Sequence, residues 1–258
     1  MMQWDPTLYL KFGAERTRPA ADLLARVLSN TPNLIVDIGC GPGNSTALLR
    51  ARHPQARLIG VDASADMLAD AAKSGVEAQW AQGDFETWAP PEPADLIYSN
   101  AALQWADAPL ETAKRLFSCL APGGVLAFQV PYNQDQTSYT EVRDAVSMPR
   151  WREALKGVRQ YDPGFTKAEE YYRAFSALGG ECDIWHTTYL HALEGEDAVF
   201  RWMSATGIRP FVQALAGSDR DAFEQEVRAR YARAFPRDPD GRTLFAFRRL
   251  FAVIARPA

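Results

Sequence analysis

The sequence predicts an α/β fold built on a doubly wound, mostly parallel sheet of seven strands. Short apolar runs alternate with helical patterns over the first 130 residues, and a glycine-rich loop directly follows the first run. Such alternation is typical of parallel sheets with helices on both faces. Two further strand-like runs toward the C-terminus complete the seven.

The first five strands are predicted from apolar runs bounded by turn residues, at 34–38, 57–61, 77–81, 95–99 and 124–130. Strands buried on both faces have this near-continuous apolar character. Helical patterns lie between them, and the last of these stops at Pro122-Gly123-Gly124. After residue 130 the pattern becomes mainly helical, near 138–147, 167–178, 197–205 and 219–235, with strand-like runs only at 183–192 and 244–255.

Composition excludes several classes of protein. The chain has 258 residues, of which 47% are hydrophobic, and a net charge of -4, so it is globular and has no global attraction to phosphate backbones or anionic bilayers. We therefore expect neither a nucleic-acid nor a membrane partner. We also expect a monomer. The three cysteines and three histidines form no metal-binding spacing. We therefore expect no bound metal. The sequence shows no signal peptide and no long apolar run, so we expect a cytoplasmic protein.

The glycine-rich loop is the most specific feature of the sequence, and it reads Asp37-Ile38-Gly39-Cys40-Gly41-Pro42-Gly43-Asn44. Its position between a strand and a helix predicts close approach of the backbone to a ligand. A dinucleotide fingerprint requires glycine where Asn44 stands, so a nicotinamide or flavin site is not favoured. The carboxylate of Asp37 would repel a pyrophosphate and attract an ammonium group.

Polar residues close each of the next three strands. Asp62 follows the second and is placed to accept both hydroxyls of a ribose. Gly83-Asp84-Phe85 follows the third, where Asp84 could accept from an exocyclic amine and Phe85 could flank a purine. The segment from Asn100 to Trp105 follows the fourth. Each residue alone also fits a turn or a helix cap, but the ordered set describes a site for S-adenosylmethionine.

These segments resemble a known family. The loop DIGCGPGN, the acid in GVDAS, the GDF segment, SNAALQW and LAPGG are together similar to class I S-adenosylmethionine-dependent methyltransferases over residues 34–130. The resemblance implies a Rossmann-like sheet, with S-adenosylmethionine as cofactor and S-adenosylhomocysteine as product. The segments WDPTLYLKFGAERTRPAADLL, DIWHTTYLHAL and SATGIRPFVQAL extend it, over nearly the whole chain, to the trans-aconitate methyltransferases.

The narrower resemblance implies an O-methyltransferase that esterifies a carboxylate of trans-aconitate, a small tricarboxylic or dicarboxylic acid being the partner. No general base is expected, because a carboxylate with a pKa near 4 is ionised at pH 7. Asn100 and Trp105 would position the acceptor, and Arg18, Trp105 and Arg209 would bind it. The predicted cofactor-binding residues are Tyr9, Arg16, Asp37, Gly39, Gly41, Asn44, Asp62, Ala63, Met67, Gly83, Asp84, Phe85 and Asn100.

Arg209 precedes Pro210, which predicts a helix that starts at the proline and has Arg209 as its N-cap. A guanidinium and a helix N-terminus would together clamp a carboxylate. The alternative is that Arg209 pairs with a nearby acid or points to solvent. We predict a cofactor-binding core at 34–130 and, at 131–258, a helical substrate cap (136–165 and 195–238) interleaved with the last two strands. The resemblance further implies that the N-terminal segment at 1–33 folds over the cofactor as a lid.

Three other functions remain open at this stage. The acceptor could be another small acid, a phenol or an amine, and a phenol or amine would show a rate that rises with pH. The chain could bind the cofactor without turnover. A dehydrogenase is the least favoured, because the loop departs from the dinucleotide fingerprint at Asn44.

Overall fold

The computed structural model describes residues 17–28, 31–158, 166–204 and 207–258. These form two compact units, which are described separately. Unit 1 contains the described residues up to Pro131 together with Thr166–Thr187 and Leu250–Ala258, and unit 2 contains those of Tyr132–Phe165 and Thr188–Arg249.

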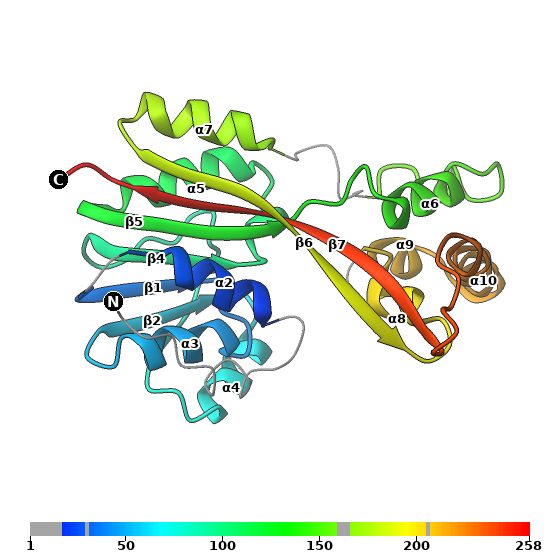
Figure 1. Cartoon of the computed structure of the whole chain (residues 1–258), viewed down its shortest axis with the longest axis horizontal. Coiled ribbons are helices and arrows are strands. Elements are labelled where there is room, and N and C mark those ends of the chain that lie inside the picture. The colour runs from blue at the N-terminus through cyan, green and yellow to red at the C-terminus, as the bar shows by residue number, and fades with distance from the viewer. Residues whose placement is uncertain (1–16, 29–30, 159–165, 205–206) are drawn as a thin grey trace. The chain divides into compact units, whose positions relative to one another are not determined.

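The sheet has seven strands in the order β3-β2-β1-β4-β5-β7-β6 (Figure 1). The strands are β1 (Leu34–Ile38), β2 (Arg57–Asp62), β3 (Gln79–Gln82), β4 (Ala94–Asn100), β5 (Leu120–Pro131), β6 (Glu181–Glu194) and β7 (Arg242–Ala255). Neighbours among β1 to β5 are parallel, and β7 is antiparallel. The predicted doubly wound, mostly parallel seven-stranded sheet is confirmed.

β5 differs from its predicted start. It begins at Leu120 and runs through the Pro-Gly-Gly segment that the sequence predicts as a helix stop. The pairing with β4 explains this, because Ala94 faces Leu120 while Leu96 faces Val125, which leaves a bulge in β5. Turn residues fit such a bulge because it interrupts the regular ladder. The sequence signal therefore marked an irregularity inside a strand.

In unit 1, helices cover both faces of the sheet (Figure 1). On one face, Tyr98 of β4 donates its hydroxyl to the carbonyl of Ala20 at 2.5 Å. On the other, the ring of Phe128 in β5 lies 5.0 Å from that of Tyr171. The elements of this unit besides its strands are α2 (Arg18–Arg26), α3 (Asn44–Arg52), α4 (Ala65–Lys73), the 3-10 turn η1 (Leu103–Trp105), α5 (Pro109–Ser118) and α7 (Ala168–Ala177).

Unit 2 has its own apolar core, supplied by four helices and by parts of β6 and β7. Its centre includes the fully buried Phe223, whose ring meets Trp151 edge-on at 5.4 Å. Burying one such side chain is worth about 1.5–3 kcal/mol. The helices are α6 (Thr137–Val146), α8 (Ala198–Ser204), α9 (Arg209–Ala214) and α10 (Gly217–Ala234).

A search of the described helices finds none that is long and apolar enough to span a bilayer.

Candidate functional site

The glycine loop after β1 is held by β2. The backbone N–H groups of Gly39 and Cys40 both donate to the carbonyl of Val61, at 2.8 and 3.0 Å. Gly39, Gly41 and Gly43 have φ values of +68°, +54° and +92°, which L side chains rarely adopt. Three left-handed residues therefore let the chain turn sharply at the carboxyl end of β1.

Two glycines of this loop are constrained in different ways. A Cβ on Gly39 would lie 2.2 Å from the Cβ of Ala102, so packing inside the protein excludes a side chain there. A Cβ on Gly41 would have no described atom within 4 Å. Gly41 thus leaves its backbone open to a ligand, as the predicted cradle requires.

The end of β2 meets this loop through Asp62. Its Oδ2 accepts from the backbone N–H of Gly41 and its Oδ1 from that of Ser64, both at 2.9 Å. These bonds fix the carboxylate, which is half-buried and keeps further lone pairs on both oxygens. Asp62 and Gly41, which the sequence places in one site, are thus brought together.

Asp37 lies fully buried at the base of the loop. Its Oδ2 accepts from the hydroxyls of Ser45 and Thr46 in α3, at 2.8 and 2.7 Å, while its Oδ1 has no hydrogen-bond partner among the described residues. Burial raises the pKa of this carboxyl to about 7, against the lowering effect of the two hydroxyls. A carboxylate oxygen without a partner beside an open glycine loop fits a cationic ligand group.

At the end of β3, the structure gives two predicted residues local roles. Asp84 is exposed, and its Oδ1 accepts from the backbone N–H of Glu86 at 2.8 Å, so it caps a turn. A Cβ on Gly83 would lie 2.5 Å from Trp88, so packing alone accounts for this glycine. Phe85 is half-buried nearby in sequence.

Two further predicted residues lie where β2 passes into α4. The carbonyl of Ala63 accepts from the side chain of Gln82 at 3.1 Å. Met67 receives the cap of α4, its N–H donating to the hydroxyl of Ser64 at 3.3 Å, and its side chain is 45% exposed. Ala63 and Met67 are both exposed at the carboxyl end of β2, so a ligand there could contact them.

At the end of β4, Asn100 is paired in register with Gln129 of β5. The side chain of Gln129 donates to the Oδ1 of Asn100 at 2.5 Å. Trp105, in η1, is 46% exposed. Sequence analysis missed Gln129, although its polarity inside the apolar run GVLAFQV is a signal that could have found it.

The backbone beyond Asn100 is held in an unusual conformation. Ala101 has a φ of +56°, rare for a residue with a side chain. Its N–H donates to the carbonyl of Gln129 at 2.9 Å, and its carbonyl accepts from the side chain of Gln104 at 2.6 Å. The Oε1 of Gln104 is buried without a hydrogen-bond partner among the described residues. Strained residues of this kind cluster at binding sites.

The remaining predicted residues are placed as follows. Tyr9 and Arg16 lie outside the described residues. Asn44 is exposed as the first residue of α3, and Arg18 is exposed on α2, 4.0 Å from Asp22. Arg209 belongs to unit 2, so the structure does not place it relative to the glycine loop.

The predicted N-cap role of Arg209 is wrong. The helix α9 includes Arg209 as its first residue, and its N-cap is Ile208, which already has a helical backbone with φ -92° and ψ -24°. The chain thus enters the helix one residue earlier than Pro210 suggests. The helix is only six residues long, so it does not supply the helix N-terminus that the predicted carboxylate clamp requires. The Arg209 side chain itself is exposed.

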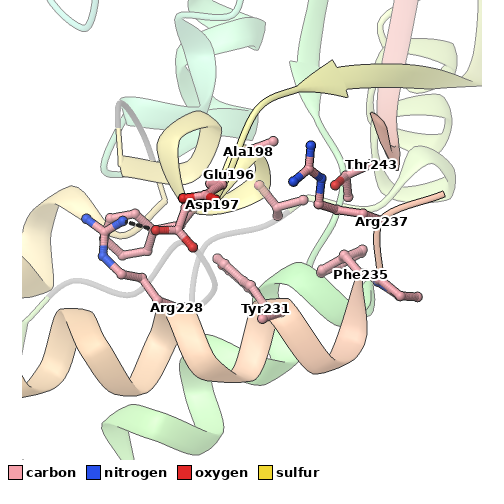
Figure 2. A pocket seen from close by; sticks show the side chains of 12 residues that line it. Glu196, Asp197, Ala198, Arg228, Tyr231, Phe235, Arg237 and Thr243 are labelled. Carbon is pink, nitrogen blue, oxygen red and sulfur yellow. Dashed lines mark hydrogen bonds and ion pairs between the residues drawn. The ribbon is translucent and has the colours of Figure 1, made fainter. Parts of the chain in front are cut away.

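Unit 2 contains a separate hollow of about 480 Å³ beside α8 and α10 (Figure 2). Within it, Arg228 contacts Asp197 at 2.6 Å and lies 3.7 Å from the centre of the Phe200 ring. The charges of Arg228 and Asp197 therefore neutralise one another within the hollow. None of the predicted site residues lines this hollow, which is formed by Glu196, Asp197, Ala198, Val199, Phe200, Arg228, Tyr231, Ala232, Phe235, Pro236, Arg237 and Thr243.

The glycine-loop site therefore offers an open backbone cradle, two carboxylates and the amide of Asn100. No group of three or more His, Cys, Asp or Glu side chains in the described part of the chain could hold a metal ion. The arrangement suits a ligand that carries a cation and a diol.

Comparison with known proteins agrees with this geometry. A family model described as a methyltransferase domain matches residues 12–179. A protein of Acidovorax ebreus named trans-aconitate 2-methyltransferase is 44% identical over 256 residues, which cover 99% of each chain.

Two solved structures share the fold. The YcgJ protein from Bacillus subtilis gives a TM-score of 0.59 at 16% identity, covering 93% of this chain and 99% of that one. The plantazolicin methyltransferase BpumL, in complex with a pentazolic desmethylPZN analogue and SAH, gives a TM-score of 0.51 at 16% identity, covering 98% of this chain and 85% of that one. At this identity the likeness concerns the fold alone.

Proposed function

Since this chain belongs to the methyltransferase family, we propose that it transfers the methyl group of S-adenosylmethionine to a carboxylate of trans-aconitate. The observation that carries the proposal is the full-length relative, which bears that activity in its name and is 44% identical. The product would be a methyl ester, and S-adenosylhomocysteine would be released.

The residues at the glycine loop fit the cofactor. When bound, S-adenosylmethionine supplies an electrophilic methyl group on its sulfonium. In the proposed assignment, Asp62 accepts from the ribose hydroxyls, Asp37 balances the ammonium group and Gly41 allows close approach of the backbone. Two observations support these roles: the carboxylate of Asp62 is fixed by hydrogen bonds, and the Oδ1 of Asp37 has no hydrogen-bond partner in the described part of the chain.

The acceptor makes few chemical demands on the chain. A carboxylate is already nucleophilic at pH 7, so the protein has to orient it and exclude water rather than remove a proton. We propose Asn100 and Trp105 for orientation, and Arg18 and Arg209 for the other carboxylates, because arginine binds such groups with two parallel hydrogen bonds. The lid at 1–33, the cap at 131–258 and the monomeric state stay predictions.

A transfer assay tests the proposal directly. Methyl-labelled S-adenosylmethionine is incubated with trans-aconitate, other di- and tricarboxylic acids, a phenol and an amine. We expect label in trans-aconitate that mild base releases as methanol, the behaviour of an ester. Label that resists base, or label only in the phenol or amine, would replace the acceptor. Cofactor binding without turnover on any compound would identify a binding protein instead.

The variant Gly41→Ala provides the control for this assay, because it obstructs the cofactor cradle without changing any side chain that is proposed to contact the acceptor. At a cofactor concentration well below saturation its activity should fall in step with its cofactor affinity, whereas unchanged activity would point to a contaminating enzyme or remove Gly41 from the cofactor site.

A further inference from the structure

We propose that Gln129 is a positioning residue, which turns the side-chain amide of Asn100 so that its NH2 group faces the acceptor carboxylate. The inference rests on the proposed function and names a residue that neither the sequence analysis nor the relatives assign.

The two amides lie side by side at the carboxyl ends of neighbouring strands. β4 and β5 are parallel and pair Asn100 with Gln129 and Tyr98 with Ala127. Paired residues of parallel strands project to the same face, and successive residues alternate between faces. Asp37 pairs with Tyr98, so Asp37, Asn100 and Gln129 share one face of the sheet.

The hydrogen bond between the two amides has a direction. The Nε2 of Gln129 donates to the Oδ1 of Asn100 at 2.5 Å, and Gln129 is fully buried while Asn100 is half-buried. The oxygen of Asn100 is thus engaged by Gln129. Its Nδ2 makes no hydrogen bond to any residue in the described part of the chain, so two N–H donors remain for a ligand.

Gln129 also holds the residue that follows Asn100. Its carbonyl accepts from the N–H of Ala101, which has the left-handed φ of +56°. Gln129 therefore fixes two successive residues, one through its side chain and the other through its backbone. The side chain of Asn100 is thus held at its oxygen, and the backbone that follows Asn100 is held by the same residue.

The orientation matters because of the acceptor's chemistry. A carboxylate can only accept hydrogen bonds, whereas an asparagine amide presents two donors on nitrogen and an acceptor on oxygen. Turned the other way, the Asn100 oxygen would face the carboxylate oxygens and repel them. A lone asparagine can rotate between these states, and the Gln129 donor selects one of them.

A double-mutant cycle tests the proposal, with trans-aconitate as acceptor and S-adenosylmethionine at saturation. Gln129→Met keeps the side-chain length but removes the donor, and Asn100→Ala removes the amide through which Gln129 is proposed to act. We expect Gln129→Met to raise the KM for trans-aconitate about tenfold and to leave cofactor affinity within twofold. In the Asn100→Ala background we expect no further rise, because effects that pass through one partner do not add.

Gln129→Glu adds a readout that depends on pH. Above the pKa of the new carboxyl, that group can only accept, so it draws the NH2 of Asn100 toward itself and leaves the Asn100 oxygen facing the acceptor. Below that pKa its O–H donates to the Asn100 oxygen and restores the native orientation. We therefore expect the rise in KM relative to the wild type to shrink as the pH falls. Asp37 on β1 shares this face of the sheet, and Asp62 closes β2 beyond it. Gln129→Glu is therefore also measured in the Asn100→Ala background, where an effect on these carboxylates would remain and an effect through Asn100 would not.

Three outcomes would overturn the proposal. The first is an equal rise in KM from Gln129→Met in the wild-type and Asn100→Ala backgrounds, and the second is an unchanged KM in Gln129→Met. The third is a Gln129→Glu defect that persists in the Asn100→Ala background. The exposed Gln79→Met on β3 serves as the matched control and should match the wild type. Failure of the wild type to methylate trans-aconitate would reject the proposed function, whereas lack of coupling in an active enzyme rejects only the role of Gln129.

Discussion

The backbone N–H of Gly41 donates to the Oδ2 of Asp62 at 2.9 Å, which joins the loop after β1 to the end of β2. The other oxygen of Asp62 accepts from Ser64 at the start of α4. One carboxylate therefore arranges two segments that approach the proposed cofactor, and changing it should affect both.

Asp62→Asn should weaken the binding of S-adenosylmethionine by about 1–3 kcal/mol, the usual cost of losing hydrogen bonds to a charged acceptor. The amide must direct its N–H2 at the N–H of Gly41 or of Ser64, because both oxygens of Asp62 now accept. Isothermal titration calorimetry measures the affinity. Asp66→Asn, on the exposed first turn of α4, is the control. Equal affinity in a folded Asp62→Asn protein would remove Asp62 from the site.

The glycines of the loop should respond differently to alanine. Gly41→Ala should cost about 1–2 kcal/mol of unfolding free energy for its left-handed backbone, and it should lower cofactor affinity at least tenfold. Gly75→Ala matches it in strain and open space, with a φ of +75°, but lies between α4 and β3. Chemical denaturation and calorimetry should show equal stability loss in both variants and lost binding only in Gly41→Ala.

Gly39→Ala should be the most destabilising of the three. Its new methyl group adds overpacking against Ala102, typically about 1–3 kcal/mol, to the same backbone strain. A melting temperature equal to that of Gly75→Ala would show that the loop relaxes freely.

Asp37 should make the stability of the protein without cofactor depend on pH. Its pKa in the folded protein, about 7, exceeds the ordinary 3.8 because of burial. The folded state therefore holds the proton more strongly than the unfolded state. The stabilisation from this group is complete below about pH 4 and is lost as the pH rises to 7, at about 1.4 kcal/mol per unit of pKa shift.

Asp37→Asn carries no charge at any pH, so its melting temperature relative to the wild type should rise between about pH 4 and pH 7 and then level off. Thermal melts across this range provide the measurement. A constant difference would mean that Asp37 does not titrate there.

Methyl transfer itself should show little pH dependence. At saturating cofactor and trans-aconitate, kcat should be nearly constant above about pH 6, because the acceptor carboxylate is already ionised. A steep rise between pH 7 and pH 9 in a labelled-methyl assay would indicate a proton acceptor that takes part in the reaction.

Arg209→Lys should raise the KM for trans-aconitate about tenfold, because an ammonium group cannot reproduce the two parallel hydrogen bonds of a guanidinium. Cofactor affinity should stay within twofold. Arg233→Lys, on the exposed surface of α10, controls for a general change of surface cation. If the two variants behave alike, the acceptor is bound by other arginines.

Local patterns account for the parts of the fold that the sequence predicts well. β1 matches its predicted range, since a five-residue apolar run bounded by turn residues has no competing helical interpretation. The sharp turn from Gly39 to Gly43 could also be predicted from the order of residues, because the left-handed backbone at each glycine depends on that residue itself and not on distant contacts.

Features that depend on strand register or on packing could not be predicted from the sequence. The pairing of Asn100 with Gln129 joins residues from two strands, and no periodicity reports which residues face each other. From the sequence, Gly83 fits a ligand site as well as it fits a packing role. The structure decides for packing, because Trp88 occupies the space that a Cβ on Gly83 would need. The N-cap at Ile208 depends on one backbone conformation that the sequence around Pro210 does not specify.

The contact between Gly39 and Ala102 means that two segments from separate strand ends share one small volume. A larger side chain at position 102 would push against the first glycine of the loop, so this alanine limits the shape of the cradle as firmly as the glycine does. Removing the methyl group at 102 would make room for one at 39, but the left-handed φ of +68° would still favour glycine there. A protein engineer who wishes to reshape the loop would therefore have to change its backbone as well as Ala102.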